Sequence, residues 1–147
     1  MSIIRTGAFA LIGLAVLGAG GFAALGQYSK RGSAPGLTGG TLAPCPASPN
    51  CVSSEAGTEA AKRVEPLASA SWDALPGAIA AMGGQVTRRE DGYIAAEFTS
   101  RVFGFVDDLE LRRGEDAVHV RSASRVGHSD NGVNAARVAQ LRSRLDD

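Results

Sequence analysis

The sequence predicts an α+β domain: a four-stranded antiparallel sheet with two helices on one face, preceded by an N-terminal transmembrane or signal helix. Three observations lead to this prediction. Residues 8–25 form an uncharged apolar run. Four segments between residues 85 and 124 alternate apolar and polar residues with the period of two that is typical of strands. Apolar residues recur at helical spacing in residues 72–82 and 133–145.

Composition indicates one domain and argues against one class of partner. A chain of 147 residues has room for a single domain of ordinary size. Its 15 basic and 15 acidic residues give a net charge of zero. Because domains that bind nucleic acids usually carry an excess of basic residues, no nucleic-acid partner is expected.

The uncharged run, AFALIGLAVLGAGGFAAL, admits two interpretations. A helix of this length measures roughly 27 Å, close to the hydrocarbon thickness of a bilayer. Residues 1–26 are therefore either an uncleaved membrane anchor or a signal peptide cut after Ala24-Leu25-Gly26. The run is long for the apolar centre of a signal peptide, which favours the anchor and makes the membrane a partner through residues 8–25.

Residues 27–42 have the composition of a flexible linker. Their sequence, QYSKRGSAPGLTGGTL, is rich in Gly, Ser, Pro and Thr and shows no hydrophobic period. A flexible coil of this length spans roughly 20–25 Å. Residues 43–147 are then expected to form a globular domain held a short distance from the membrane.

The only two cysteines, Cys45 and Cys51, stand close together in CPASPNCVSS. Their spacing differs from that of a C-x-x-C redox motif, and His119 and His128 add too few ligands for zinc, so neither a metal nor a cofactor is expected. We predict a structural disulfide. Disulfides persist in oxidising compartments, which places the domain outside the cytoplasm.

Residues 72–82 are predicted to form the first helix of the domain, capped by Ser71 and ended by Gly83-Gly84. This helix and the C-terminal helix are expected to cover the same sheet face. The residues expected to meet there are Trp72, Leu75, Ile79 and Met82, then Val133, Val138 (or Arg137), Leu141 and Leu145, and on the sheet Ile94, Phe98, Leu109 and Val120. The opposite face is expected to carry Tyr93, Glu97, Asp108, Glu110, His119 and Arg121.

Turn chemistry predicts how the first two strands pair. A three-residue loop, Glu90-Asp91-Gly92, sets Val86 opposite Ala96. A two-residue Asp-Gly turn would instead set Val86 opposite Glu97, which buries less apolar surface. The three-residue loop is therefore predicted.

The second pair of strands is predicted to turn around Gly114-Glu115. A slip of one residue would place leucines against arginines, so the apolar pattern restricts the register. The predicted pairs are Leu111 with Val118, Leu109 with Val120 and Asp107 with Ser122 on one face, and Asp108 with Arg121 and Glu110 with His119 on the other.

Asp107 is anomalous because it is in phase with Phe105 and Leu109 on the apolar face. A buried carboxylate needs hydrogen-bonding partners. Ser122, Ser124 and the start of the C-terminal helix are expected to supply them, unless a β-bulge turns the side chain outward.

The junction between the last strand and the last helix, VHVRSASRVGHSDNGVN at residues 118–134, is the candidate functional site. Ser129 or Asp130 caps the helix, and a helix N-terminus can bind anions. The favoured interpretation is nevertheless structural: the arginines pair with acids, and the hydroxyls cap and turn the chain. The candidate ligand-binding residues are Asp107, Asp108, Arg121, Ser122, Ser124, Arg125, Ser129, Asp130 and Asn134.

Several motifs in order give the chain a resemblance to a known family. CPASPNCVSS, a helix that begins with Trp, EFTSRVFGFVDDLEL and VRSASRVGHSDNGVN together resemble the domain-of-unknown-function family numbered 1499, over roughly residues 42–145. The resemblance implies a protein of the bacterial envelope or of a plastid, often behind a leader or membrane segments, without an established activity. The chain departs from the family pattern at Asn131, where an apolar residue is common, and at Ala135, where a basic residue is common.

These observations favour a binding or assembly module over an enzyme. The expected location is the bacterial inner membrane, with the domain facing the periplasm, or the periplasm itself after cleavage near Gly26. The partner is expected to be an anionic or amphipathic small ligand or an envelope protein. The alternative is an enzyme that uses an Asp/Arg cluster, although no catalytic triad, phosphate loop or metalloprotease motif appears. A pocket lined by Asp107, Arg121 and Arg125 would favour a ligand site or an enzyme.

Overall fold

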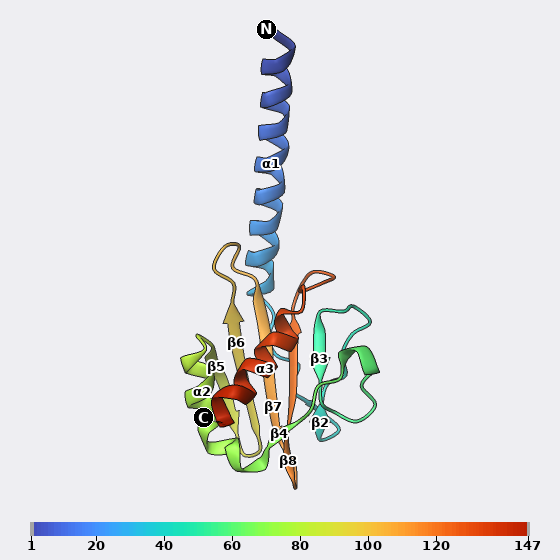
Figure 1. Ribbon diagram of the computed structural model, residues 1–147, viewed down its shortest axis with the longest axis vertical. Coiled ribbons are helices and arrows are strands. Elements are labelled where there is room, and N and C mark those ends of the chain that lie inside the picture. Colours follow the sequence, from blue (N-terminus) through green and yellow to red (C-terminus); the bar gives the residue numbers. More distant parts are fainter. Residues whose placement is uncertain (1, 147) are drawn as a thin grey trace.

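The computed structural model describes the backbone of residues 2–146 and the side chains of residue 13 and residues 15–146. Within these residues a long N-terminal helix leads into an antiparallel sheet that is partly covered by shorter helices (Figure 1). In chain order the elements are α1 (Ser2–Ser29), β1 (Leu37–Thr38), β2 (Thr41–Leu42), β3 (Cys51–Ser53), the 3-10 helix η1 (Ala60–Lys62), β4 (Leu67–Ala68), the 3-10 helix η2 (Ser69–Ala74), α2 (Leu75–Ala81), β5 (Gln85–Glu90), β6 (Tyr93–Thr99), β7 (Val106–Arg113), β8 (Ala117–Ser124) and α3 (Val133–Asp146).

The main sheet has six strands in the described part of the chain, not the predicted four. Its order is β3-β8-β7-β6-β5, and β4 pairs with β8 beside β3. The predicted strands are β5 to β8, so the α+β class and the antiparallel pairing are confirmed. The two additional strands, β3 and β4, were missed because they are three and two residues long, too short to show a period.

The first hairpin has the predicted pairing but not the predicted loop. Val86 lies opposite Ala96, and Glu90 lies opposite Tyr93, which leaves only Asp91-Gly92 in the turn. A register shift between Val86 and Arg88 reconciles the short turn with this pairing. The bulge adds one residue to β5 and so keeps Val86 away from Glu97.

The second hairpin is displaced by two residues from the predicted register. Leu109 lies opposite Ser122 rather than Val120, because the turn is centred on Glu115-Asp116, one residue later than predicted. A shift of two residues leaves every side chain on its predicted face, so the apolar pattern alone did not distinguish the two registers. The other predicted pairs, Leu111–Val118, Asp107–Ser122, Asp108–Arg121 and Glu110–His119, are also wrong.

The main core lies between one face of the sheet and the helices α2 and α3. Trp72, Leu75 and Ile79 are buried there, although Trp72 belongs to η2 and α2 begins only at Leu75. Ser71 does not cap α2, because its hydroxyl donates to the carbonyl of Ala68 at 2.5 Å. The predicted helix over residues 72–82 is therefore a 3-10 turn followed by a short α-helix.

Helix α3 buries a narrower apolar stripe than predicted. Val138 and Leu141 are fully buried, and Leu145 packs at the edge of the core. Val133 is 49% exposed, contrary to the prediction. Asn134 and Arg137 are buried instead, so the first turns of α3 meet the sheet through polar groups.

The opposite face of the sheet is covered by the segment for which composition predicts a flexible linker. Leu42 and Ala34 pack against Tyr93 and Ala95 of β6. The segment therefore lies along the sheet, and it does not form an extended connection between α1 and the domain. The charged residues on this face are consequently enclosed.

Helix α1 extends away from one end of the sheet, and its last turns contact the domain (Figure 1). The Ser29 hydroxyl donates to the carbonyl of Gly26 at 2.6 Å and accepts the Val106 N–H at 3.0 Å. Phe22 packs against the ring of Phe103, with centroids 5.4 Å apart.

The predicted membrane span lies partly outside the described side chains, which begin at residue 13 and omit residue 14. Among the residues that are described, no helix combines the length and the apolar character needed to cross a membrane.

Gly26 allows α1 to approach the β6–β7 loop. A Cβ at this position would lie 1.8 Å from the Phe103 carbonyl oxygen, whereas a Cβ at Gly21 would contact nothing within 4 Å. We expect Gly26→Ala to force the helix and the loop apart and to lower the unfolding free energy by about 1–3 kcal/mol. Gly21→Ala is the matched control and is expected to be neutral or slightly stabilising. Thermal unfolding measures the stability of each variant, and the rate of proteolytic cleavage after residue 30 measures how firmly α1 is held against the loop. Equal stabilities and equal cleavage rates for the two variants would contradict this role of Gly26.

Candidate functional site

Asp130 caps helix α3, as one of the two predicted alternatives requires. Its carboxylate accepts the N–H of Gly132 at 3.1 Å and the N–H of Asn134 at 2.8 Å. Burial would raise the pKa of Asp130, but these backbone N–H groups and the Asn134 amide outweigh it and hold the pKa below its ordinary value. Ser129 assists by accepting the N–H of Asn131 at 3.3 Å.

Asn134 is fully buried and joins β8, the cap and the disulfide loop. Its amide nitrogen donates to the Asn50 carbonyl at 3.1 Å, to Ser124 Oγ at 3.1 Å and to the Asp130 carboxylate at 2.7 Å. Its amide oxygen accepts the Ser122 hydroxyl at 2.6 Å. With both polar atoms engaged inside the protein, Asn134 serves the structure rather than a ligand.

Asp107 lies on the predicted face, and its principal partner is Arg137 of α3. The two side chains form an ion pair of 2.7 Å, and the Arg137 guanidinium also donates to Ser122 Oγ at 3.0 Å. That guanidinium stacks over the ring of Phe98 at 4.6 Å. The sequence offered Arg137 only as an alternative to Val138 in the stripe that faces the sheet, and no pairing rule linked it to Asp107.

Asp108 and Arg125 form a second cluster on the other face of the sheet. Arg125 binds the Asp108 carboxylate through two nitrogens, at 2.8 and 2.6 Å, and also contacts Glu97 at 2.5 Å. It donates further to the Ser29 carbonyl at 3.2 Å. The hydrogen bonds that Arg125 donates to Asp108 and Glu97 raise its pKa further above the ordinary value.

Glu110 is fully buried at the centre of the same face. It accepts the Tyr93 hydroxyl at 2.8 Å, the N–H of Gly36 at 2.9 Å and a guanidinium nitrogen of Arg121 at 2.8 Å. Burial first, and then the bond to Glu110, raises the pKa of Tyr93. Arg121 therefore pairs with Glu110, and not with Asp108 as predicted.

Glu55 is a further acid on this face that the sequence did not single out. Arg112 binds its carboxylate at 2.8 and 2.9 Å, and the N–H of Leu42 donates to it at 3.0 Å. Burial would raise the pKa of Glu55, but the Arg112 hydrogen bonds, the Leu42 N–H and the Arg112 charge together hold it below 4.5.

The candidate residues therefore divide between two faces and do not form one site. Asp107, Ser122 and Asn134 lie with α3, whereas Asp108, Arg121 and Arg125 lie beneath residues 29–42. No pocket lined by Asp107, Arg121 and Arg125 together is formed by the described residues, because Asp107 contacts α3 whereas the two arginines contact acids on the other face of the sheet.

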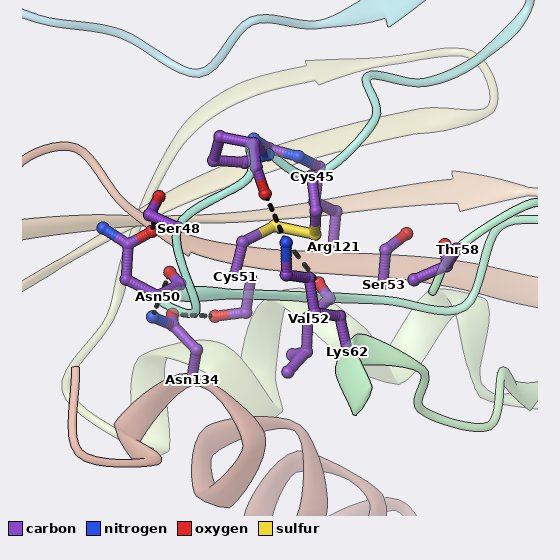
Figure 2. Close-up of a disulfide and its surroundings, with 12 residues drawn as sticks. Cys45, Ser48, Asn50, Cys51, Val52, Ser53, Thr58, Lys62, Arg121 and Asn134 are labelled. Carbon is purple, nitrogen blue, oxygen red and sulfur yellow. Dashed lines mark hydrogen bonds between the residues drawn. A yellow bond between two sulfur atoms is a disulfide. The ribbon is translucent and has the colours of Figure 1, made fainter. Parts of the chain in front are cut away.

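The Cys45–Cys51 disulfide is confirmed, with a Cα–Cα distance of 5.7 Å. Lys62 is buried beside it and donates to the carbonyls of Pro46 and Ala47 at 2.5 and 3.1 Å (Figure 2). Asn134 lies at the other end of the loop, where it holds Asn50 (Figure 2). The disulfide thus shapes a loop whose carbonyls satisfy two buried polar side chains.

A pocket of about 330 Å³ lies where α1, the β6–β7 loop and the β8–α3 loop meet. Four candidate residues border it: Asp107, Ser124, Ser129 and Asp130. The remaining lining is mainly apolar and includes Phe22, Leu25, Phe105, Val126 and Val133. Arg121 and Arg125 do not line this pocket. Among the described residues, no group of three or more His, Cys, Asp or Glu side chains is placed to hold a metal ion.

A family model described as "Protein of unknown function (DUF1499)" matches residues 41–145. The match extends from β2 to the last turn of α3 and so includes both ion-pair clusters and the disulfide. No curated protein and no solved structure was found to match the chain.

Asp107 tests whether the α3 cluster stabilises the fold. Asp107→Asn removes the charge that compensates Arg137, whose side chain is only 9% exposed. We expect the unfolding free energy to fall by about 1–3 kcal/mol in urea titrations. Glu90→Gln, which breaks the exposed Arg88–Glu90 pair, is the matched control and is expected to change it by less than about 0.5 kcal/mol. An unchanged stability of Asp107→Asn would exclude the structural role.

Through Glu55, the unfolding free energy of the protein is expected to depend on pH. Because its pKa is lower in the folded protein than the ordinary 4.5, its contribution is complete at neutral pH and is lost as pH falls below that value. Glu55→Gln should therefore be less stable at neutral pH and show a flatter decline between about pH 5 and pH 3. Urea midpoints measured across this range test it, with the exposed turn variant Glu115→Gln as control. Parallel profiles for wild type and Glu55→Gln would refute the assignment.

Proposed function

The chain belongs to the DUF1499 family, whose members are described as proteins of unknown function, and we propose that it is a binding module tethered at the bacterial cell envelope. One observation carries the proposal. The acids and arginines singled out from the sequence form ion pairs with one another. A mainly apolar pocket is open at the junction with α1. The module is then expected to bind an amphipathic ligand at that junction, and its ion pairs support the fold.

The enzyme alternative receives no support from the geometry. It requires Asp107 or Asp108 as a base with Arg121 or Arg125 beside the same substrate. A general base must lie within hydrogen-bond reach of the proton that it removes. Asp108 is buried and held by two nitrogens of Arg125, and Asp107 lies on the other face of the sheet.

Two features support a location outside the cytoplasm. The Cys45–Cys51 bond is of a kind that persists in oxidising compartments. The uncharged run at residues 8–25 has the length of a bilayer span. We infer an inner-membrane protein whose domain faces the periplasm.

The continuity of α1 favours an anchor that is retained over a leader that is removed. The helix runs unbroken from Ser2 to Ser29, and Gly26 lies within it against the Phe103 carbonyl. Cleavage near Gly26 would release Phe22 and Leu25 from the pocket that they line.

Fractionation of cells that express the full chain tests the tether. We expect the protein in the membrane pellet after carbonate washing, and in solution only after detergent is added. The double variant Val16→Arg/Leu17→Arg should move to the soluble fraction, because each arginine adds about 2.5–3.5 kcal/mol to the free energy of insertion. Leu37→Arg/Thr38→Arg, outside the run, is the matched control and should stay in the pellet. A wild-type chain that is soluble without detergent would contradict the anchor.

The location is tested independently by the cysteines. Alkylation of the chain in intact cells should modify Cys45 and Cys51 only after reduction. Two thiols that react before reduction would remove the argument for an oxidising compartment.

A further inference from the structure

The end of α1 borders two spaces, an apolar pocket and a more polar hollow. Phe22 and Leu25 line its apolar part, together with Phe105 and Val133 from the two loops. Val126 borders this pocket and also a second hollow, whose lining includes Tyr28 and Arg31. Val126 is the lining residue that the two spaces share, and the second hollow is the one that carries basic side chains.

Arg31 provides a positive charge that the protein does not neutralise. Among the described side chains, Arg31 takes part in no ion pair, and it is exposed. Arg125, which also borders the second hollow, is occupied by Asp108 and Glu97. An anionic head group in this hollow would therefore find Arg31 available.

The order of these residues along α1 matches the layers of a bilayer leaflet. If residues 8–25 occupy the hydrocarbon, Phe22 and Leu25 lie at its edge. Ser29 follows Leu25 by about 6 Å of helix. The polar layer of one leaflet is roughly 5–8 Å deep, which places Tyr28 and Ser29 at the level of the head groups, with Arg31 directly after the end of the helix. Tyrosine is enriched at that level, and basic residues there attract anionic lipids.

Apolar side chains outside α1 are exposed at the same end of the domain. Val102 at the tip of the β6–β7 loop is 81% exposed, and Val133 at the start of α3 is 49% exposed. Both loops lie at the end of the sheet from which α1 projects (Figure 1). Such a gathering of exposed apolar groups marks an interaction surface, and the bilayer is the apolar phase that α1 itself would enter.

We propose that this pocket holds one acyl chain of an anionic bilayer lipid, with the lipid head group beside Arg31. The pocket volume of about 330 Å³ lies at the lower end of the range for small-molecule sites, which suits a single chain. The inference rests on the proposed membrane tether and specifies the ligand of that module.

Photocrosslinking in vesicles tests the proposal with the full chain. The vesicles contain phosphatidylcholine and phosphatidylglycerol in a ratio of 4:1, and the phosphatidylglycerol carries a photoreactive acyl chain. We expect crosslinks within residues 100–106 and 126–133 in addition to α1. Crosslinks confined to α1 would show ordinary boundary lipid and would overturn the proposal. A wild-type chain that does not enter the membrane fraction would instead refute the tether, so the two failures are distinguishable.

Substitutions at exposed positions separate the pocket from the membrane surface. Val133→Asp places a charge in the pocket and should reduce crosslinks to the two loops at least fivefold, without changing membrane association. Val133→Trp should also reduce them, because it fills the pocket with an apolar group. Leu37→Asp is the matched control, since Leu37 is similarly exposed, at 44%, but lines neither space. Unfolding curves establish that each variant is folded, and unchanged loop crosslinks in both Val133 variants would overturn the proposal.

Arg31→Gln tests the position of the head group. We expect the preference for photoreactive phosphatidylglycerol over an equally labelled phosphatidylcholine to fall about fivefold, because one basic residue near the surface contributes about that factor. Arg101→Gln, an exposed residue outside both spaces, should have a smaller effect. An unchanged preference in Arg31→Gln would show that the head group lies elsewhere.

Discussion

The structure depends on the neutralisation of charges that the sheet buries. Moving a carboxylate out of water is costly unless donors replace the lost solvation, and removing one partner of a buried pair leaves an uncompensated charge. Glu110 is fully buried, and its three donors come from β6, from β8 and from the backbone of the segment before β1. That last donor explains why residues 30–42 lie along the sheet in spite of a composition typical of a linker. Charged side chains of β7 and of the residue after β8 thus form hydrogen bonds to the backbone of the segment that covers them.

The same requirement organises the face that carries α3. Asp107 is mostly enclosed and Asn134 is fully buried, because α3 brings Arg137 to the first and the disulfide loop brings the Asn50 carbonyl to the second. The polar contacts position the helix, and Val138 and Leu141 then supply the apolar burial. Since the acids of both clusters are paired with arginines inside the protein, they present little charge to a ligand. The surface that remains available to a partner is at the end of α1, where apolar groups are exposed.

The accuracy of the sequence predictions follows the range of the interactions involved. The faces of β6, β7 and β8 were predicted correctly because alternation is a local property of a strand. The registers were harder, because a two-residue shift preserves those faces, and both hairpins differ in their turns or bulges. The pair Asp107–Arg137 joins residues thirty positions apart, on elements whose packing no local pattern specifies. Sequence reasoning therefore named many of the polar residues of the clusters but paired them wrongly.

By itself the sequence determined strands β5 to β8, helix α3 with a cap at Ser129 or Asp130, the Cys45–Cys51 disulfide and the family resemblance, because each depends on residues close together in the chain. Only the tertiary structure decided which acid meets which arginine, where residues 30–42 lie and where a pocket remains open. Those outcomes depend on side chains that are distant in sequence and brought together by packing. Burial then determines whether a charged group serves the fold or remains available to a partner.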